Sequence, residues 1–510
     1  MDLILTFDLG TTSVKTCIFG RELGILGSST LEYQLETPAP GIVELPSQVY
    51  WDTVRRGIRE AAENASVDLR EVKAIAISTQ GETMIPVDSQ GNALHNALVW
   101  LDERAHAEAA DISTRFDVET FYAHTGVPEC TGYCPVSKLL WFRRNQPEVY
   151  EKAYKFLLLE DFIIQRLTGR FVTEKSLLCT TGYYDIMADD YWQEMLDTME
   201  LDREKLPQAL ECGTVAGTVL PEIARELGLS EEAVVITAAM DQTAAAVGAG
   251  NLVPGVVTET TGTAMCIGAT ADHPDMHHPA RICVYRHIYP GKYLLLPTCM
   301  TAGMVFKWFK DAFCQEEARQ ARETGVSVYD LLGDQATQAA PGANGLTLLP
   351  YFTGVIQPDN DPNARGVFLG VGLDTKKPEF VRAIFEGIAY MLRENLALIE
   401  TVDGQKVTAV RSLGGGSRST LWRQIKADVC GVEISSMSEA ECTSLGAAIL
   451  AAVALGYYPD AAEAARVGNS LASTLTPDEG KKALYDRGFA RYQRLWLACR
   501  PIFNEEGLQL

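Results

Sequence analysis

The sequence lacks any apolar run of the length that crosses a membrane. No stretch approaches 18 consecutive apolar residues, so no membrane-spanning helix is predicted. The first residues, MDLILTFDLG, also lack the basic segment of a secretory signal peptide and run directly into a strand pattern. We therefore expect a cytoplasmic protein with no membrane partner.

Positive charge is scarce. The chain has 44 Lys and Arg against 67 Asp and Glu, a net charge of −23 over 510 residues. Such a field repels phosphate backbones, which excludes nucleic acid as the expected partner. A phosphorylated ligand would need local compensation from helix N-termini, backbone N–H groups or Mg²⁺.

Cysteines spaced as metal ligands are missing too. The 12 cysteines are scattered singly except for Cys130 and Cys134, which have no second pair to complete a zinc site. We expect reduced thiols. His273, His277 and His278 fall in ADHPDMHHP, a composition typical of a solvated loop, and their role stays open.

Glycine-bounded apolar runs alternate with helical patterns along the chain, which is typical of an α/β protein. Amphipathic helices are predicted over residues 48–63, 136–145, 377–402 and 419–430. A chain of this length should form two large domains. The Gly- and Pro-punctuated GNLVPGVV (residues 250–257) predicts the boundary, which gives domains 1–250 and 251–510.

A short pattern occurs twice. TFDLGTTSVKTCIFG near the start and TETTGTAMCIGA (residues 258–269) both place Gly-Thr between β-rich runs, which predicts the turn of a β-hairpin. Two such hairpins suggest a duplicated domain with a cleft between the copies.

Both turns, and one glycine run, could bind phosphate. In DLGTTSVK, glycine allows close approach of backbone N–H groups, hydroxyls can donate, and Asp8 could hold Mg²⁺ through water. The stretch is not a Walker loop, and a polar hairpin turn is the alternative. TGTAM (residues 261–265) has the same chemistry. LGGGSRSTLW (residues 413–422) suits either nucleotide binding or a tight turn.

Carboxylates follow two predicted strands. Glu82 in STQGETM comes just beyond KAIAIS, and Asp241 comes between VVITAAM and an Ala-rich segment. Asp241 could be a helix N-cap, worth about 1 kcal/mol, or a general base. Trp100, with Asp102 and Arg104 nearby, suits a polyol or a place in the core.

YCPVSKLLWFRRN (residues 133–145) and GVFLGVGLDTKKPEFVRAIFE (residues 366–386) match two signature regions of a known family. With DLGTT, MDQ, TGT and GGGS in order, the whole chain resembles the FGGY family of carbohydrate kinases, in the actin/hexokinase/Hsp70 superfamily. The resemblance implies two ribonuclease-H-like α/β domains with a central catalytic cleft. It also implies transfer of the γ-phosphoryl group of ATP, with Mg²⁺, to a sugar or polyol hydroxyl. Many members are dimers, which makes a homodimer one possible assembly without fixing the oligomeric state.

Matching positions imply roles for individual residues. Asp241 is the implied catalytic base, and Asp8 and Asp241 are the implied metal residues. The implied substrate-binding residues are Gln80, Glu82, Trp100, Tyr133, Asp241 and Gln242. The implied nucleotide-binding residues are Thr11, Thr12, Ser13, Gly262, Thr263, Gly303, Gly415, Gly416 and Ser419. Glycerol kinases carry Asn at the position of Ser419, which leaves the adenine contact open.

The substrate is less defined. Glycerol kinases carry Gln-Arg-Glu-Thr where this chain has Gln80-Gly81-Glu82-Thr83, and the Met-His-Gly usual in xylulokinases is absent. Loss of the arginine predicts a wider pocket, suited to a ketopentose such as xylulose or a four- to five-carbon polyol. Glycerol is the alternative substrate. The competing class is a non-catalytic ATP- or sugar-binding member of the superfamily, although such a sensor would be expected to lose Asp241.

Overall fold

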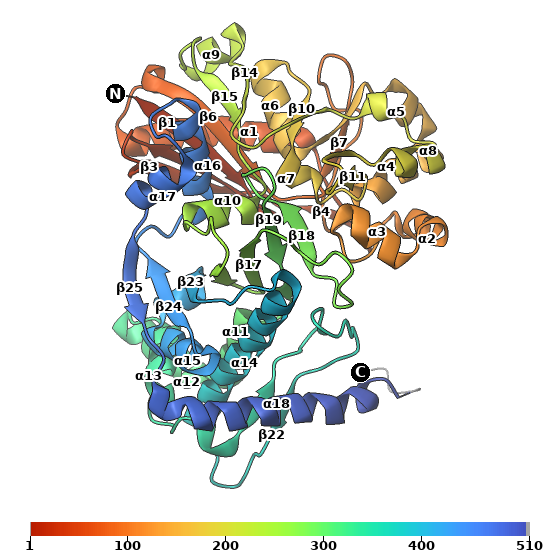
Figure 1. Ribbon diagram of the computed structural model, residues 1–510. Helices are drawn as coiled ribbons and strands as arrows, with labels where there is room; N and C mark the ends of the chain where they lie inside the picture. Colours follow the sequence, from red (N-terminus) through yellow and green to blue (C-terminus); the bar gives the residue numbers. More distant parts are fainter. Residues whose placement is uncertain (1, 506–510) are drawn as a thin grey trace. The chain divides into compact units, whose positions relative to one another are not determined.

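The computed structural model describes residues 2–505, which divide into two compact units (Figure 1). Unit 1 comprises the described residues up to Leu252 together with Asp275–Leu294 and Glu441–Ser470. Unit 2 comprises Val253–Pro274, Leu295–Ala440 and the described residues from Leu471 onward. The chain thus leaves unit 1 close to the boundary predicted at residue 250. It then returns twice, which the sequence pattern did not predict.

The central sheet of unit 1 has the strand order β14-β15-β6-β1-β2-β3. Its strands are β1 (Leu3–Leu9), β2 (Ser13–Phe19), β3 (Ile25–Glu32), β6 (Val72–Thr79), β14 (Val215–Thr218) and β15 (Val234–Thr237). β6 runs parallel to β1 and β15, whereas the β1–β2, β2–β3 and β14–β15 pairs are antiparallel. The β1–β2 pair is the first predicted hairpin.

Helices pack on both faces of this sheet. Successive apolar side chains of β1 point to opposite faces, so each face has a core for helices to cover. Leu3, Leu5 and Phe7 join one core cluster with α1 (Ser47–Ala65) and α6 (Leu159–Thr168), whereas Ile4 joins another with α10 (Asp241–Gly248) and α16 (Cys442–Ala454). α16 lies in one of the returning segments and packs closely on α10. A Cβ added at Gly446 would lie 1.9 Å from the Ala244 carbonyl oxygen.

The central sheet of unit 2 repeats this pattern in β17-β16-β23-β24-β25. These five strands of the sheet are β16 (Val256–Thr261), β17 (Met265–Ala271), β23 (Ala409–Leu413), β24 (Glu433–Met437) and β25 (Leu471–Leu475), and β20 (Thr298–Cys299) also pairs with β17. The successive pairings are antiparallel, parallel, parallel and antiparallel, as they are from β2 to β14 in unit 1. β16–β17 is the second predicted hairpin, so the duplicated α/β core is confirmed.

The remaining elements surround these sheets. Unit 1 also contains β4 (Glu36–Ala39), β5 (Ile42–Leu45), β7 (Met84–Val87), β8 (Ala97–Leu98), β9 (Lys155–Leu158), β10 (Val172–Glu174), α2 (His106–Arg115), α3 (Val118–Thr125), α4 (Pro135–Asn145), α5 (Pro147–Lys152), α7 (Lys175–Leu178), α8 (Gln193–Thr198), α9 (Pro221–Leu227) and α17 (Ala461–Gly468). Unit 2 also contains α11 (Gly303–Phe313), α12 (Gln315–Thr324), α13 (Val328–Ala336), η3 (Ala343–Gly345), β21 (Thr347–Leu349), β22 (Val367–Leu369), α14 (Lys377–Asp403), α15 (Thr420–Cys430) and α18 (Lys482–Phe503). The four helices predicted from periodicity are α1, α4, α14 and α15, and each prediction matches the observed bounds to within about two residues.

Over residues 2–505, no helix combines the length and the apolar character that a membrane span requires.

Candidate active site

Three carboxylates lie near the carboxyl ends of the parallel strands of unit 1. Asp8 is the second-last residue of β1, Glu82 follows β6, and Asp241 begins α10 shortly after β15. The carboxyl ends of neighbouring parallel strands form one edge of a sheet, which is where α/β proteins commonly bind ligands. The sequence alternative that Asp241 is a helix N-cap is wrong, because Met240 holds that position.

Burial and the charge of Asp241 raise the pKa values of these carboxyl groups. Burial raises the pKa of Asp8 to about 7, and the charge of Asp241 adds to the shift. Burial likewise raises the pKa of Asp241 to about 6 and that of Glu82 to about 8, the latter with a further contribution from Asp241. The charge of Asp241 therefore acts on both Asp8 and Glu82, which indicates that Asp241 lies near each of them.

A lysine that the sequence analysis did not assign supports Glu82. Lys138 of α4 is fully buried, and its Nζ donates to the carbonyl oxygens of Glu82 (3.0 Å) and Val99 (2.9 Å). Burial lowers the pKa of Lys138 to about 8. Glu82 has a positive φ of 54°, a strained conformation for a non-glycine residue. The bond from Lys138 therefore fixes the backbone on which the Glu82 carboxylate depends.

The space beside Gly81 is filled. A Cβ added at Gly81 would lie 2.9 Å from Cγ2 of Thr180, which is 2% exposed. The Thr180 hydroxyl donates to the Leu177 carbonyl oxygen (2.9 Å) and lies 3.4 Å from the Glu82 amide nitrogen. The sequence predicted a wider pocket at Gly81. That prediction is wrong on the side where a Gly81 side chain would point, because Thr180 occupies that volume.

Gly81→Ala should therefore destabilise the protein by about 1–3 kcal/mol through overpacking, as measured by urea denaturation. Adding Thr180→Ser should recover most of the loss, because it removes the nearest methyl group and keeps the hydroxyl. Gly24→Ala is the matched control, since no atom lies within 4 Å of the added carbon. Equal effects of Gly81→Ala with and without Thr180→Ser would contradict the steric explanation.

The first hairpin is tied to the Trp100 segment. Gly10 N donates to the Ser13 carbonyl oxygen (3.0 Å), which closes a turn with an exposed Thr12 and half-exposed Thr11 and Ser13. The indole Nε1 of Trp100 donates to the Thr11 hydroxyl (2.9 Å). Residues expected at the phosphates and at the substrate are thus in direct contact within unit 1.

The contacts of Asp102 and Arg104, close to Trp100 in the sequence, differ from the polyol contact that the sequence suggested. Asp102 is fully buried and accepts hydrogen bonds from Arg104 (2.8 Å) and Val43 N (2.7 Å). Arg104 also pairs with Glu44 (2.6 Å), so Asp102 and Arg104 form an internal ion network rather than a polyol contact. The hydroxyl of Tyr133 donates to Glu103, a partner that the sequence did not suggest.

The two glutamines differ in their surroundings. Gln80 is 5% exposed, and its side-chain amide has no hydrogen-bond partner among the described residues. Gln242 is the second residue of α10, is half-buried, and lies beside Asp241. Only Gln242 of the pair therefore has a partly accessible side chain.

A further carboxyl group of unit 1 should make stability depend on pH. Asp161 is fully buried, its Oδ2 accepts the Leu158 N–H (2.8 Å), and burial raises its pKa from 3.8 to about 7. The folded state therefore holds this proton more tightly than the unfolded state. The stabilisation is complete below about pH 4 and is lost as the pH rises through about 7.

Asp161→Asn should remove that part of the pH dependence. Between pH 5 and 8 the wild type should lose about 2–3 kcal/mol more stability than the variant, at about 1.4 kcal/mol per pKa unit. Urea titrations at several pH values measure the difference. Parallel stability curves for the two proteins would contradict a raised pKa at Asp161.

The second hairpin and the glycine run meet in unit 2. Gly262 and Thr263 form the exposed tip of β16–β17, and the Thr263 carbonyl oxygen accepts the N–H groups of Ala302 (3.0 Å) and Met304 (3.1 Å). A Cβ at Gly303 would lie 2.2 Å from the Gly262 carbonyl oxygen. The hairpin tip therefore packs directly on the start of α11, and glycine is required there.

The glycine run packs on the same hairpin. Gly414 has a φ of +70°, and a Cβ at Gly416 would lie 2.7 Å from that of Thr261. Gly415 is exposed, and a Cβ there would meet only the Thr261 carbonyl oxygen, at 4.0 Å. The Ser419 hydroxyl accepts the Trp422 N–H (3.2 Å) and caps α15, so this side chain has a structural task that the sequence did not predict.

A buried ion pair contacts the second hairpin, β16–β17. Lys426 of α15 and Glu259 of β16 are fully buried, with Nζ 2.9 Å from each carboxylate oxygen. Lys426 also bonds the Thr261 hydroxyl (2.9 Å), and Ser412 donates to Glu259 (2.8 Å). This network joins the hairpin, the strand before the glycine run and the helix after it. Sequence reasoning missed it entirely.

The donor set of unit 1 suits Mg²⁺ better than a zinc-like site. In residues 2–505 no group of three or more His, Cys, Asp or Glu side chains could hold a metal ion. Mg²⁺ is usually held by one or two carboxylates, with water and substrate phosphate as the other ligands. Asp8 and Asp241 fit that requirement, and the charges of Asp241 and Glu441 act on Asp8.

Known proteins match the whole chain. A xylulose kinase from Staphylococcus epidermidis is 25% identical over 501 residues, with 98% of each chain covered. A gluconokinase from Bacillus subtilis is 28% identical over 455 residues, covering 89% of this chain and 88% of its own. The ligand-bound crystal structure of a xylulose kinase from Lactobacillus acidophilus is 27% identical and has a TM-score of 0.88, covering 98% of this chain and 99% of its own.

The family assignment rests on both halves of the chain. The N-terminal domain of the FGGY family of carbohydrate kinases matches residues 3–248, and the C-terminal domain of the same family matches residues 258–455. The two central sheets, with their shared pairing pattern, agree with that assignment. The chain belongs to the FGGY family of carbohydrate kinases and is a carbohydrate kinase.

Proposed function

We propose that this kinase transfers the γ-phosphoryl group of ATP to a hydroxyl of a neutral ketopentose, such as xylulose, or of a four- to five-carbon polyol. The observation that carries the proposal is the group of three carboxylates, Asp8, Glu82 and Asp241, near one sheet edge of unit 1. A hydroxyl acceptor needs a base and hydrogen-bond acceptors, and carboxylates supply both.

Asp241 takes the proton of the reacting hydroxyl while that oxygen attacks the γ-phosphorus. The bond from phosphorus to the bridging oxygen breaks, and ADP leaves with those electrons. Bound Mg²⁺ would be held by Asp8 and Asp241 and would neutralise phosphate charge. Glu82 accepts substrate hydroxyls, with Gln80, Trp100, Tyr133 and Gln242 as the other proposed substrate-binding residues.

Each unit contains proposed nucleotide-binding residues. Thr11, Thr12 and Ser13 offer hydroxyl and N–H donors at an open turn, and Gly262 and Thr263 do so at the exposed tip of the second hairpin. The exposed Gly415 would let a nucleotide approach the backbone closely. Gly303 and Gly416 are also proposed nucleotide-binding residues, although their missing side chains make room for the second hairpin. Ser419 contributes through the start of α15, because its hydroxyl is engaged as the helix cap.

The charges favour a neutral substrate over an aldonate. Ionised Asp8 and Asp241 would repel a carboxylate, and the nearby cations are already engaged. Lys138 is buried and donates to two backbone carbonyl oxygens, and Arg104 forms ion pairs with Asp102 and Glu44. The likeness to a gluconokinase therefore does not decide the substrate class.

A substrate panel with an ADP-coupled assay tests the proposal. We expect higher kcat/KM for at least one ketopentose or four- to five-carbon polyol than for glycerol or gluconate. Preferred turnover of gluconate would contradict the electrostatic argument, and preferred turnover of glycerol would support the alternative substrate. Absence of sugar-dependent ADP release across the panel would contradict the proposed substrate range.

A further inference from the structure

The three residues before Asp241 are held by side chains from three other elements. Ala238, Ala239 and Met240 join β15 to α10, belong to neither, and are all buried. Ala238 N donates to Glu160 Oε1 (3.1 Å). The Ala239 carbonyl oxygen accepts the Ser78 hydroxyl (2.7 Å), and Met240 N donates to Ser176 Oγ (3.0 Å). Thus each successive residue of the connection has a side-chain bond.

The direction of the Ser176 bond is fixed by a further carboxylate. Ser176 Oγ donates to Glu174 Oε1 (2.8 Å), which leaves its lone pairs for the Met240 N–H. Glu174 also accepts the backbone N–H groups of Ser176 and Leu177 at 2.6 Å each. A serine whose proton is committed in this way is an oriented acceptor.

We infer that Ser78, Ser176 and Glu160 are positioning residues for phosphoryl transfer, because they hold the backbone that carries Asp241. The inference rests on the proposed role of Asp241 as the base. A base must lie within hydrogen-bond reach of the proton it removes, and displacement by about 1 Å can cost about 100-fold in rate. These side chains contact the backbone before Asp241 and not its carboxylate.

Ser78→Ala and Ser176→Ala test the inference, with ATP and the panel sugar of highest turnover. We expect each variant to lose at least about ten-fold in kcat, with KM for both substrates within about two-fold of the wild type. Thr6→Val is the matched control, because it removes a fully buried, unpartnered hydroxyl from β1 without touching the connection. Its kcat should be unchanged.

A double-mutant comparison separates positioning from general damage. If Ser78 acts through Asp241, then Ser78→Ala should cause no further loss in an Asp241→Asn background. A full ten-fold loss in that background, or wild-type kcat in both serine variants, would overturn the inference while leaving the base role intact. Normal turnover of Asp241→Asn alone would overturn the base role, and this inference with it.

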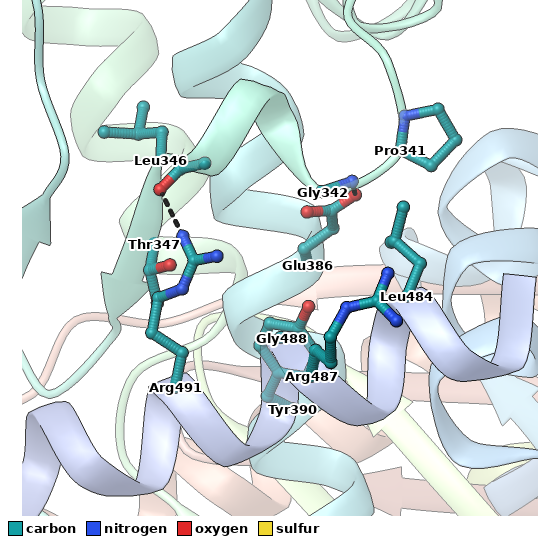
Figure 2. Close-up of a pocket in the computed structure, with 11 residues that line it drawn as sticks. Pro341, Gly342, Leu346, Thr347, Glu386, Tyr390, Leu484, Arg487, Gly488 and Arg491 are labelled. Atoms are coloured by element: carbon teal, nitrogen blue, oxygen red, sulfur yellow. Dashed lines mark hydrogen bonds between the residues drawn. The ribbon is translucent and has the colours of Figure 1, made fainter.

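A different feature lies in unit 2, in a cavity of about 200 Å³ lined by residues of α14, α18 and the segment around η3 (Figure 2). Arg487 and Arg491 extend from α18 toward the segment that carries Gly342. Glu386 also lines the cavity, but its carboxylate is engaged by Arg382 (2.9 Å), Gly342 N (2.9 Å) and Tyr485 (3.1 Å).

The cavity keeps unneutralised positive charge in a chain of net charge −23. Arg487 is exposed and pairs with no carboxylate among the described residues. Arg491 gives one N–H to the Gly345 carbonyl oxygen (2.8 Å), as the dashed line in Figure 2 shows. Its other donors remain available, since guanidinium carries five.

A tyrosine of α14 completes the donor set. Tyr390 is only 4% exposed, lines the cavity, and has no hydrogen-bond partner in the described part of the chain. A Cβ at Gly488 would lie 2.0 Å from its hydroxyl oxygen, so glycine is required for this approach. The Tyr390 hydroxyl can therefore donate to a ligand or a water in the cavity.

We propose that this cavity binds the phosphate group of a small phosphorylated molecule, with Arg487, Arg491 and Tyr390 as donors. Guanidinium groups match phosphate oxygens in charge and geometry. The volume admits a phosphate group together with part of the molecule that carries it.

Isothermal titration with inorganic phosphate, in the presence of saturating ADP, tests this site. Arg487→Ala should weaken binding at least ten-fold, and Tyr390→Phe should weaken it measurably. Arg494→Ala is the matched control, because Arg494 is exposed on the same helix but does not line the cavity. Absence of phosphate binding, or equal affinity in Arg487→Ala and the wild type, would overturn the proposal.

Discussion

Asp241→Asn should lower the turnover number by about 10²- to 10⁴-fold, the usual contribution of a general base. The change removes the proposed proton acceptor while keeping the shape of the side chain. It also removes a charge that raises the pKa of Asp8 and Glu82, so those carboxyl groups should ionise more readily. Binding of sugar should therefore change little, and the loss should fall on kcat.

Steady-state kinetics with the preferred sugar, together with calorimetric binding of ATP, measures the two effects separately. Unchanged nucleotide affinity with a large loss of kcat supports the base role. Turnover within about two-fold of the wild type would contradict it. Loss of nucleotide binding in equal proportion would instead indicate that Asp241 acts mainly through Mg²⁺.

Lys426→Met should destabilise unit 2 by about 3–5 kcal/mol, because it leaves the fully buried Glu259 carboxylate without its cation. The Thr261 hydroxyl would lose a partner in the same step. Since Glu259 and Thr261 belong to β16, the second hairpin should lose order as well as stability. Urea denaturation followed by tryptophan fluorescence measures the first effect, and ATP affinity reports the second.

Two controls test whether burial of the ion pair causes the loss of stability in Lys426→Met. Adding Glu259→Gln to Lys426→Met removes the stranded charge and should recover part of the stability. Lys307→Met breaks an exposed ion pair of α11 with Asp311 and should cost at most about 0.5 kcal/mol. Similar losses for Lys426→Met and Lys307→Met would contradict the importance of burial.

Local pattern predicted the parts of the fold that depend on neighbours in sequence. Both hairpins and four helices follow from alternation, 3.6-residue periodicity and glycine turns, and these features are encoded over a few residues. The carboxylates Asp8, Glu82 and Asp241 were found for the same reason. Each comes at or just after a readable strand end, and the carboxyl ends of parallel strands meet.

The missed features depend on residues far apart in the chain. Lys426 and Glu259 are separated by 167 positions, and Lys138 reaches the Glu82 carbonyl across 56. Nor could sequence show that Thr180 fills the space beside Gly81, which depends on where another loop lies. The local sequence shows which chemical group a position carries, but tertiary packing decides which residue that group contacts.

The interleaving of the two units has a consequence for dissecting the gene. Each unit is assembled from three separate stretches, so the polypeptide passes between them five times. A fragment ending near residue 250 would lack α16, whose Gly446 packs on the helix that begins with Asp241. Neither half of the coding sequence therefore specifies a complete unit, and the protein should be expressed and studied undivided.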